Sequence, residues 1–144
     1  MANYDKILLA VDLSEDSGKI AERALAIAKN NDAELHVIHV IEPLSFAYGG
    51  DIPMDFSGIQ DEIHQQAVQM LQKFAEKHGI DAERKHVVLG QPGVEIHALA
   101  DETGADLIIV GSHGRHGLSL LMGSTANGVL HGAGCDVLAV RVGA

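Results

Sequence analysis

Residues 106–114, with the sequence DLIIVGSHG, decide how this chain is expected to fold. The apolar run from Leu107 to Val110 is typical of a strand buried on both faces, as in a parallel sheet. It passes directly into residues 111–114, where two glycines permit a tight turn. In an open parallel sheet such a turn lies at the carboxyl edge of the strands, where ligands bind.

The rest of the chain repeats this alternation of strand and helix. Apolar runs predict strands at residues 6–11, 34–40, 86–89, 106–110 and 137–142. Helical spacing and helix-start residues predict helices after Ser14, over residues 57–77, from Pro92 and near Gly123. The pattern predicts an α/β fold of the Rossmann-like type, an open five-stranded parallel sheet of order 3-2-1-4-5 with helices on both faces. At this length, residues 1–144 are expected to form a single domain.

Three segments carry more specific expectations. Ser14 is expected to cap the first helix, with Glu15 and Asp16 in its first turn. In the helix over residues 57–77, one apolar stripe is expected to face the core. The stripe consists of Ile59, Ile63, Ala67, Met70, Leu71 and Phe74. The connection over residues 41–56 mixes turn formers with large apolar residues, so both a flap or contact surface and a poorly ordered excursion remain open.

Composition excludes several classes of protein. Twenty acidic residues against ten Lys and Arg give a formal charge of −10, which disfavours nucleic acid and anionic membranes as partners. No apolar run approaches the length of a membrane span or of a signal peptide. The single Cys135 excludes an internal disulfide, and we expect it to be a small packed residue in a cytoplasmic protein.

The glycine segment after the fourth strand has two features of a phosphate site. Glycines allow backbone N–H groups to approach a ligand closely, and a helix start at Gly123-Ser124-Thr125 offers a positive dipole end. The segment over residues 111–134 contains Arg115 and no carboxylate, so the acidic charge of the chain lies elsewhere. A P-loop and a dinucleotide-binding GxGxxG motif are both missing from the sequence.

The histidines and the serine of this segment do not compose an evident catalytic site. His36 and His39 are three apart in one strand and therefore face opposite sides, so they are not expected to share a metal. His113 is expected to lie near a ligand, whereas for His116 a phosphate contact and a solvated position both stay open. A hydrolase built from Ser112, His113 and Asp12 is disfavoured because the nucleophile elbow GxSxG is missing.

Taken together, these stretches resemble the universal stress protein family. The residues that carry the resemblance lie at 7–14, 39–41, 90–92, 105–114, 121–124 and 135–141. The resemblance implies a Rossmann-like fold and a homodimer paired through the last strand, residues 137–142. It also points to the ATP-binding branch, whose motif reads G-x-x-G, nine residues, then G-[ST]. Gly111, Gly114 and Gly123-Ser124 match this motif, although only eight residues separate Gly114 from Gly123.

The resemblance also implies the residues of the site. Asp12 would contact the ribose or adenine, and the backbone of Val40 would contact adenine. From its place at the end of a strand alone, Asp12 is expected to contact the ligand, and a Mg²⁺ contact and a helix cap stay open as alternatives. Ser112, His113, Gly114 and Ser124 would surround the ribose and phosphates. The complete set of candidate nucleotide-binding residues is Ala10, Val11, Asp12, Val40, Gly111, Ser112, His113, Gly114, Arg115, Gly123, Ser124 and Thr125.

The function expected from this set is that of a cytoplasmic, homodimeric stress-response protein that binds ATP as a regulatory signal. Backbone N–H groups would hold the phosphates, with Arg115 and Mg²⁺ adding positive charge. No general base or activated nucleophile is evident, which disfavours an enzyme. Two alternatives stay open, a nucleotide-independent dimeric scaffold that binds partner proteins and a slow ATPase.

Overall fold

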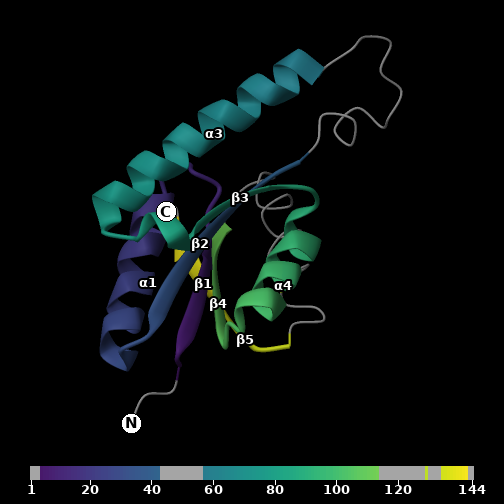
Figure 1. Cartoon of the computed structure of the whole chain (residues 1–144). Coiled ribbons are helices and arrows are strands. Elements are labelled where there is room, and N and C mark those ends of the chain that lie inside the picture. Colours follow the sequence, from purple (N-terminus) through teal and green to yellow (C-terminus); the bar gives the residue numbers. More distant parts are fainter. Residues whose placement is uncertain (1–3, 43–56, 114–128, 130–133, 143–144) are drawn as a thin grey trace.

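The fold is built on a five-stranded sheet (Figure 1). The computed structural model describes residues 4–42, 57–113, 129 and 134–142. The strands are β1 (Lys6–Ala10), β2 (Glu34–Ile41), β3 (Lys85–Leu89), β4 (Leu107–His113) and β5 (Asp136–Val142). Their order is β3-β2-β1-β4-β5, and every neighbouring pair is parallel. The predicted order and direction of the strands are both confirmed.

Helices cover both faces of this sheet. They are α1 (Ser17–Asn31), α3 (Ser57–His78) and α4 (Pro92–Thr103), with a short 3₁₀ turn η1 (Ala82–Arg84) before β3. Side chains of α1 and α3 pack on one face of the sheet, and side chains of α4 pack on the other. Figure 1 shows this division, with α1 and α3 on one side of the strands and α4 opposite.

The central strand β1 is buried on both faces. Ile7, Leu8 and Leu9 have no exposed surface, although successive side chains point to opposite sides. Ile7 and Leu9 belong to the core beneath α1 and α3, while Leu8 belongs to the core beneath α4. This double burial explains why the sequence shows a continuous apolar run here instead of an alternating one.

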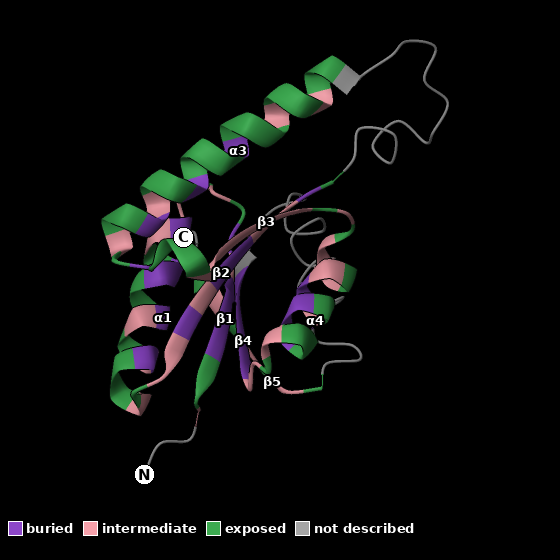
Figure 2. Cartoon of the chain, in the orientation of Figure 1, coloured by how far each residue is buried: buried purple, intermediate pink, exposed green. Residues whose placement is uncertain are grey.

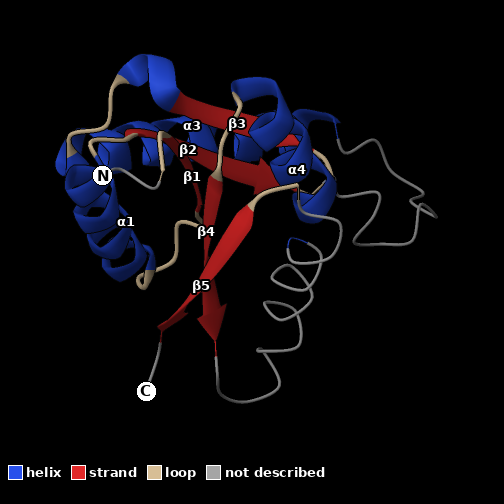
Figure 3. Cartoon of the chain, turned by 90° about the horizontal axis from the view of Figure 1, so that it is seen from below, coloured by secondary structure: helices blue, strands red, loops and turns tan. Residues whose placement is uncertain are grey.

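β4 is longer than its apolar run predicts. The strand was expected to end at Val110, with a loop from Gly111 onward, but it continues to His113. Its last residues pair with β5, from Gly111↔Val140 to His113↔Val142. Figure 3 shows β4 and β5 side by side along this stretch. The expectation was wrong because backbone pairing with β5, not side-chain hydrophobicity, extends the strand.

The start of α3 lies beyond the sheet. The helix has 22 residues and a length of about 33 Å, whereas the five-residue strand β3 spans only about 17 Å. Of the expected apolar stripe, Leu71 is fully buried and Ala67 nearly so, but Ile59 is 48% exposed and Met70 is 49% exposed. Figure 2 shows mostly exposed residues at the start of α3. The placement of Ile59 and Met70 in the core is therefore wrong. Ile59 lies near the start of α3, whereas Met70 lies between the buried Ala67 and Leu71 and is exposed because it points to another side of the helix.

Within the part of the chain that the structure describes, no helix is both long enough and apolar enough to cross a membrane.

Candidate functional site

The carboxyl edge of the sheet opens between its two central strands. The described ladder between β1 and β4 ends at the pair Leu9↔Ile109. β4 nevertheless continues to His113, and from Val110 onward it is paired with β5 on its other side. β1 itself ends at Ala10, so β4 extends past the end of β1 at the point where the strand order reverses. Open α/β sheets bind ligands at such a point, and the region between the end of β1 and the end of β4 is called the opening below.

A tight turn around Asp12 leaves β1 at this opening. Oδ1 of Asp12 accepts hydrogen bonds from the backbone N–H of Ser14 at 2.9 Å and from the hydroxyl of Ser17 at 3.1 Å. Leu13, between Asp12 and Ser14, has a φ of 62°, a left-handed backbone conformation that residues other than glycine rarely adopt. Such a backbone persists only where its surroundings hold it, and the Asp12 carboxylate supplies that restraint.

This turn also changes how α1 begins. Asp16 is the N-cap, its side chain makes no capping hydrogen bond, and the first turn of the helix contains no acidic residue. The expectation that Ser14 caps the helix, with Glu15 and Asp16 in its first turn, is wrong. The reason is that residues 12–14 form the Asp12 turn, so that the helix begins only at Ser17.

The residues next to the opening divide between the two faces of the sheet. Ala10 and Val40 pack against the core on the α4 side, which also contains Val110. Val11 instead packs on the α1 side and is 6% exposed. The α4 side of the opening therefore offers an apolar floor made by Ala10 and Val40, both of which are only partly buried.

His39 supports this end of β1 and was not predicted to do so. The backbone N–H of Val11 donates to the carbonyl of Ile38 at 3.0 Å. The carbonyl of Val11 accepts a hydrogen bond from Nδ1–H of His39 at 2.9 Å. Both backbone polar groups of Val11 are thus engaged, which fixes the strand where the Asp12 turn begins. A histidine in a strand carries no sequence signal for a contact with a residue 28 positions away.

Comparison with known proteins identifies the family of the chain. The model of the universal stress protein family matches residues 3–141. The chain belongs to the universal stress protein family. It is 43% identical over 146 residues to universal stress protein A homolog 2 of Coxiella burnetii, covering 99% of this chain and 98% of that one. It is 41% identical over 140 residues to homolog 1 of the same organism, covering 96% of each.

A solved structure of a relative extends the comparison to bound ligands. A crystal structure described as a universal stress protein in complex with cAMP superposes with a TM-score of 0.63 at 26% identity. The match covers 96% of this chain and 97% of that chain. The fold of this universal stress protein is thus shared over nearly its whole length with a protein that holds an adenine nucleotide.

The structure of this universal stress protein places part of the expected site. It brings Ala10, Val11, Asp12 and Val40 to the opening, and Gly111, Ser112 and His113 form the last three residues of β4. The remaining candidates lie outside the described residues. They are Gly114, Arg115, Gly123, Ser124 and Thr125, and the same holds for the shortened spacing between Gly114 and Gly123.

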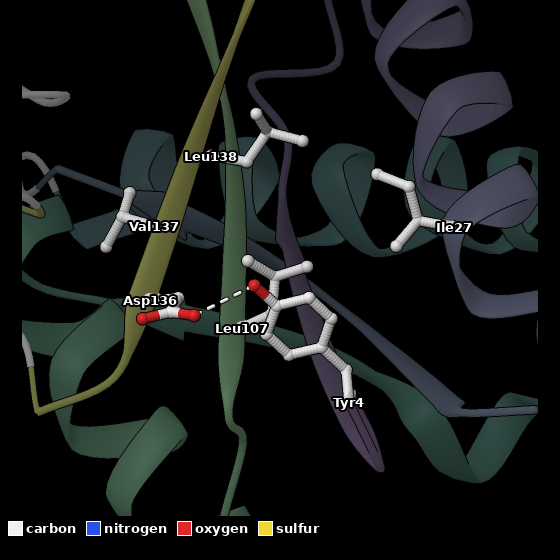
Figure 4. Close-up of a pocket in the computed structure, with 6 residues that line it drawn as sticks. All are labelled: Tyr4, Ile27, Leu107, Asp136, Val137 and Leu138. Carbon is white, nitrogen blue, oxygen red and sulfur yellow. Dashed lines mark hydrogen bonds between the residues drawn. The ribbon is translucent and has the colours of Figure 1, made fainter. Parts of the chain in front are cut away.

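A separate hollow of about 490 Å³ lies at the opposite edge of the sheet, beside the start of β5. The hydroxyl of Tyr4 donates to Oδ2 of Asp136 at 2.8 Å, as Figure 4 shows, and Ile27, Leu107 and Leu138 complete the walls. This bond to the Asp136 carboxylate raises the pKa of Tyr4. Since Tyr4 precedes β1 and Asp136 begins β5, this hollow is at the amino end of the strands and is distinct from the opening at Asp12.

Other candidate reactive groups of the described chain are accounted for by packing. His36 faces β3, where its Nδ1 lies 3.3 Å from Nε2 of His86, while His39 faces the other side, as predicted. Burial raises the pKa of the Cys135 thiol, which keeps it in its unreactive neutral form. Among the described residues, no group of three or more His, Cys, Asp or Glu side chains is placed to hold a metal ion by itself.

Proposed function

We propose that this universal stress protein binds ATP at the opening between β1 and β4 and uses the bound nucleotide as a regulatory signal. The observation that carries the proposal is the switch point at which β1 ends and β4 continues to His113, with Asp12 on one rim and residues 111–113 on the other. A carboxylate held in a turn at the end of β1, next to a strand that leads into a glycine segment, suits a ligand with both hydroxyl and phosphate groups.

The two rims would hold different parts of the nucleotide. Adenine would lie on the apolar floor of Ala10 and Val40, and the ribose hydroxyls would donate to the carboxylate of Asp12. The phosphates would extend toward residues 111–125, which contain Arg115 and no carboxylate. This local distribution allows a polyanion to bind although the whole chain carries a formal charge of −10.

The identity of the ligand is proposed in two steps. The relative solved with cAMP supports an adenine nucleotide as the ligand class. The glycines at 111, 114 and 123, followed by Ser124, support ATP within that class because they offer N–H donors for several phosphates. Mg²⁺ would enter with the phosphates and could contact Asp12, since carboxylate and phosphate oxygens are the ligands that it prefers.

The proposed role is regulatory and not catalytic. The Asp12 carboxylate already accepts two hydrogen bonds that hold the turn, so it is poorly suited to take a proton from water. A slow ATPase remains the enzymatic alternative, and a nucleotide-independent scaffold remains the other. The proposal also includes a cytoplasmic homodimer paired through the exposed edge of β5, whose apolar residues Val137, Leu138 and Val140 are only partly buried.

Equilibrium binding tests the nucleotide proposal directly. Calorimetric titration with ATP, ADP and cAMP, each with Mg²⁺, should show saturable binding, tightest for ATP and with dissociation constants below about 1 mM. Gly114→Val should weaken ATP binding by about tenfold or more, because a β-branched side chain blocks close backbone approach. Asp61→Asn, at an exposed position of α3, is a control that should bind normally.

The outcomes separate the alternatives. Tighter binding of cAMP than of ATP would move the ligand assignment to the cyclic nucleotide. No binding of any nucleotide, with an unchanged melting temperature in their presence, would favour the scaffold. Steady release of inorganic phosphate that is lost in Asp12→Asn would favour the ATPase.

A further inference from the structure

A groove runs between the β1–α1 turn and the carboxyl half of α3, and its lining begins at Leu13, the residue after Asp12. It has a volume of about 360 Å³. One wall is formed by Leu13, Ser14, Glu15, Ser17 and Gly18, and the other by α3 from Met70 to His78. The α3 wall runs for about 12 Å, which matches two turns of a helical peptide or four residues of an extended one.

The floor of the groove is apolar and partly uncovered. Met70 is 49% exposed on α3, and Phe74, one turn further along, packs its ring against His78 with centroids 4.7 Å apart. Leu13 faces them from the turn and is only partly buried, although its backbone is held in the left-handed region. A flexible methionine beside an aromatic ring is an adaptable contact for an apolar side chain of a partner.

The α3 wall of the groove is cationic, although the chain as a whole carries a formal charge of −10. Among the described residues that line the groove, Lys73 and Lys77 lie on α3, and the acidic Glu15 lies on the opposite wall. On a strongly acidic protein, a groove of this kind selects a partner that carries carboxylates beside apolar side chains.

We propose that this groove is a docking site for an acidic amphipathic segment of a partner protein. Apolar side chains of the segment contact Met70, Phe74 and Leu13, and its carboxylates pair with Lys73 and Lys77. This proposal goes beyond the nucleotide proposal and does not depend on it, since none of the residues that line the groove belongs to the proposed nucleotide-binding set.

A labelled peptide of about 12 residues, with Leu and Phe on one helical face and Asp and Glu on the other, tests the proposal by fluorescence anisotropy on the full, nucleotide-free chain. Saturable binding that weakens as salt increases is expected. A peptide with the same apolar pattern and lysines in place of the acidic residues should bind at least about tenfold more weakly.

Variants locate the binding surface. Lys77→Glu should weaken binding by about tenfold, because it replaces an attraction with a repulsion at the groove. Lys29→Glu is the matched control, because Lys29 is also an exposed lysine in the last turn of a helix but does not line the groove. It should change affinity less than about twofold, since a distant exposed charge is screened. Met70→Ala, at an exposed side chain, should weaken binding severalfold without unfolding the protein.

Three results would overturn the proposal. One is no saturable binding of the acidic peptide at about 1 mM, which is the weak limit for a specific contact of this size. Another is equal loss of affinity in Lys29→Glu and Lys77→Glu. The third is a change of oligomeric state in Lys77→Glu by light scattering, which would assign the groove to an interface between copies of this chain.

Discussion

At the scale of single residues, Asp12 stabilises the turn that follows β1. It accepts two hydrogen bonds and thereby holds Leu13 in the left-handed region. The same carboxylate lies on the rim of the proposed nucleotide site. Because it is fixed before any ligand arrives, a ribose would meet an acceptor whose position costs little further ordering.

Removing this carboxylate should destabilise the fold. Asp12→Ala leaves the N–H of Ser14 and the hydroxyl of Ser17 without their acceptor, and Ser17 is almost fully buried. We expect a loss of about 1–2 kcal/mol in the free energy of unfolding, measured by urea denaturation. Asp12→Asn keeps an acceptor oxygen and should lose clearly less. Equal losses in the two variants would show that these hydrogen bonds do not stabilise the turn.

Two partly buried histidines, His78 and His86, make the stability of the protein sensitive to acid. Burial, followed by the nearby His36, lowers the pKa of His86 below its usual value of 6.5, and burial likewise lowers the pKa of His78. The folded state therefore binds protons less readily than the unfolded chain does in this range. The contribution of these two histidines to the free energy of unfolding is fully present above pH 6.5 and is lost as the pH falls below that value.

The measurement is the urea midpoint at pH 7.5 and at pH 5.5, which we expect to be lower at the acidic pH. His86→Gln should reduce the difference between the two midpoints, because one group that resists protonation is removed. His64→Gln, at an exposed position of α3, serves as the matched control. An undiminished difference in His86→Gln would assign the acid sensitivity to other groups.

At the scale of elements, α3 shows how periodicity and packing can disagree. Its apolar residues follow a helical period, but the sheet is too short to cover the whole helix. Leu71 is fully buried, whereas its neighbour Met70 points to the groove beside the β1–α1 turn. One side of α3 therefore packs in the core, whereas the side that carries Met70 is exposed to solvent.

Adjacent substitutions test this orientation of α3. Leu71→Ala should cost about 2–5 kcal/mol, because it opens a cavity in the core beneath α1 and α3. Met70→Ala should cost less than about 1 kcal/mol, because half of the side chain is already exposed. Chemical denaturation of both variants measures the contrast. Similar losses would mean that α3 is rotated from the orientation described.

At the scale of the whole molecule, β5 is the edge strand on which the proposed dimer depends. Ala139 lies in the middle of this edge and is exposed. Ala139→Glu should shift the protein from dimer toward monomer at micromolar concentration by light scattering, because it brings two negative charges together across the pair. Ala98→Glu, on the exposed side of α4, is the control and should remain dimeric. A monomeric unmodified chain would contradict the dimer itself.

The strand order was predictable from the sequence, and so was the switch point at which the proposed site lies. Continuous apolar runs separated by helical segments leave few arrangements other than a doubly covered parallel sheet. The switch point of that sheet then predicts where a ligand binds. The turn at Asp12 was not predictable in detail, because Ser14 and Ser17 both look like helix caps and only their distances to Asp12 decide between them.

The sequence by itself determined the fold class, the strand order and the family, because these depend on periodicity and on residues that lie close together in the chain. Only the tertiary structure decided how far β4 extends, which face Val11 takes, and that His39 supports the end of β1. It also decided that Met70 lines an open groove and not the core. These outcomes depend on contacts between distant segments and on how far one element reaches over another, and neither leaves a local signal in the sequence.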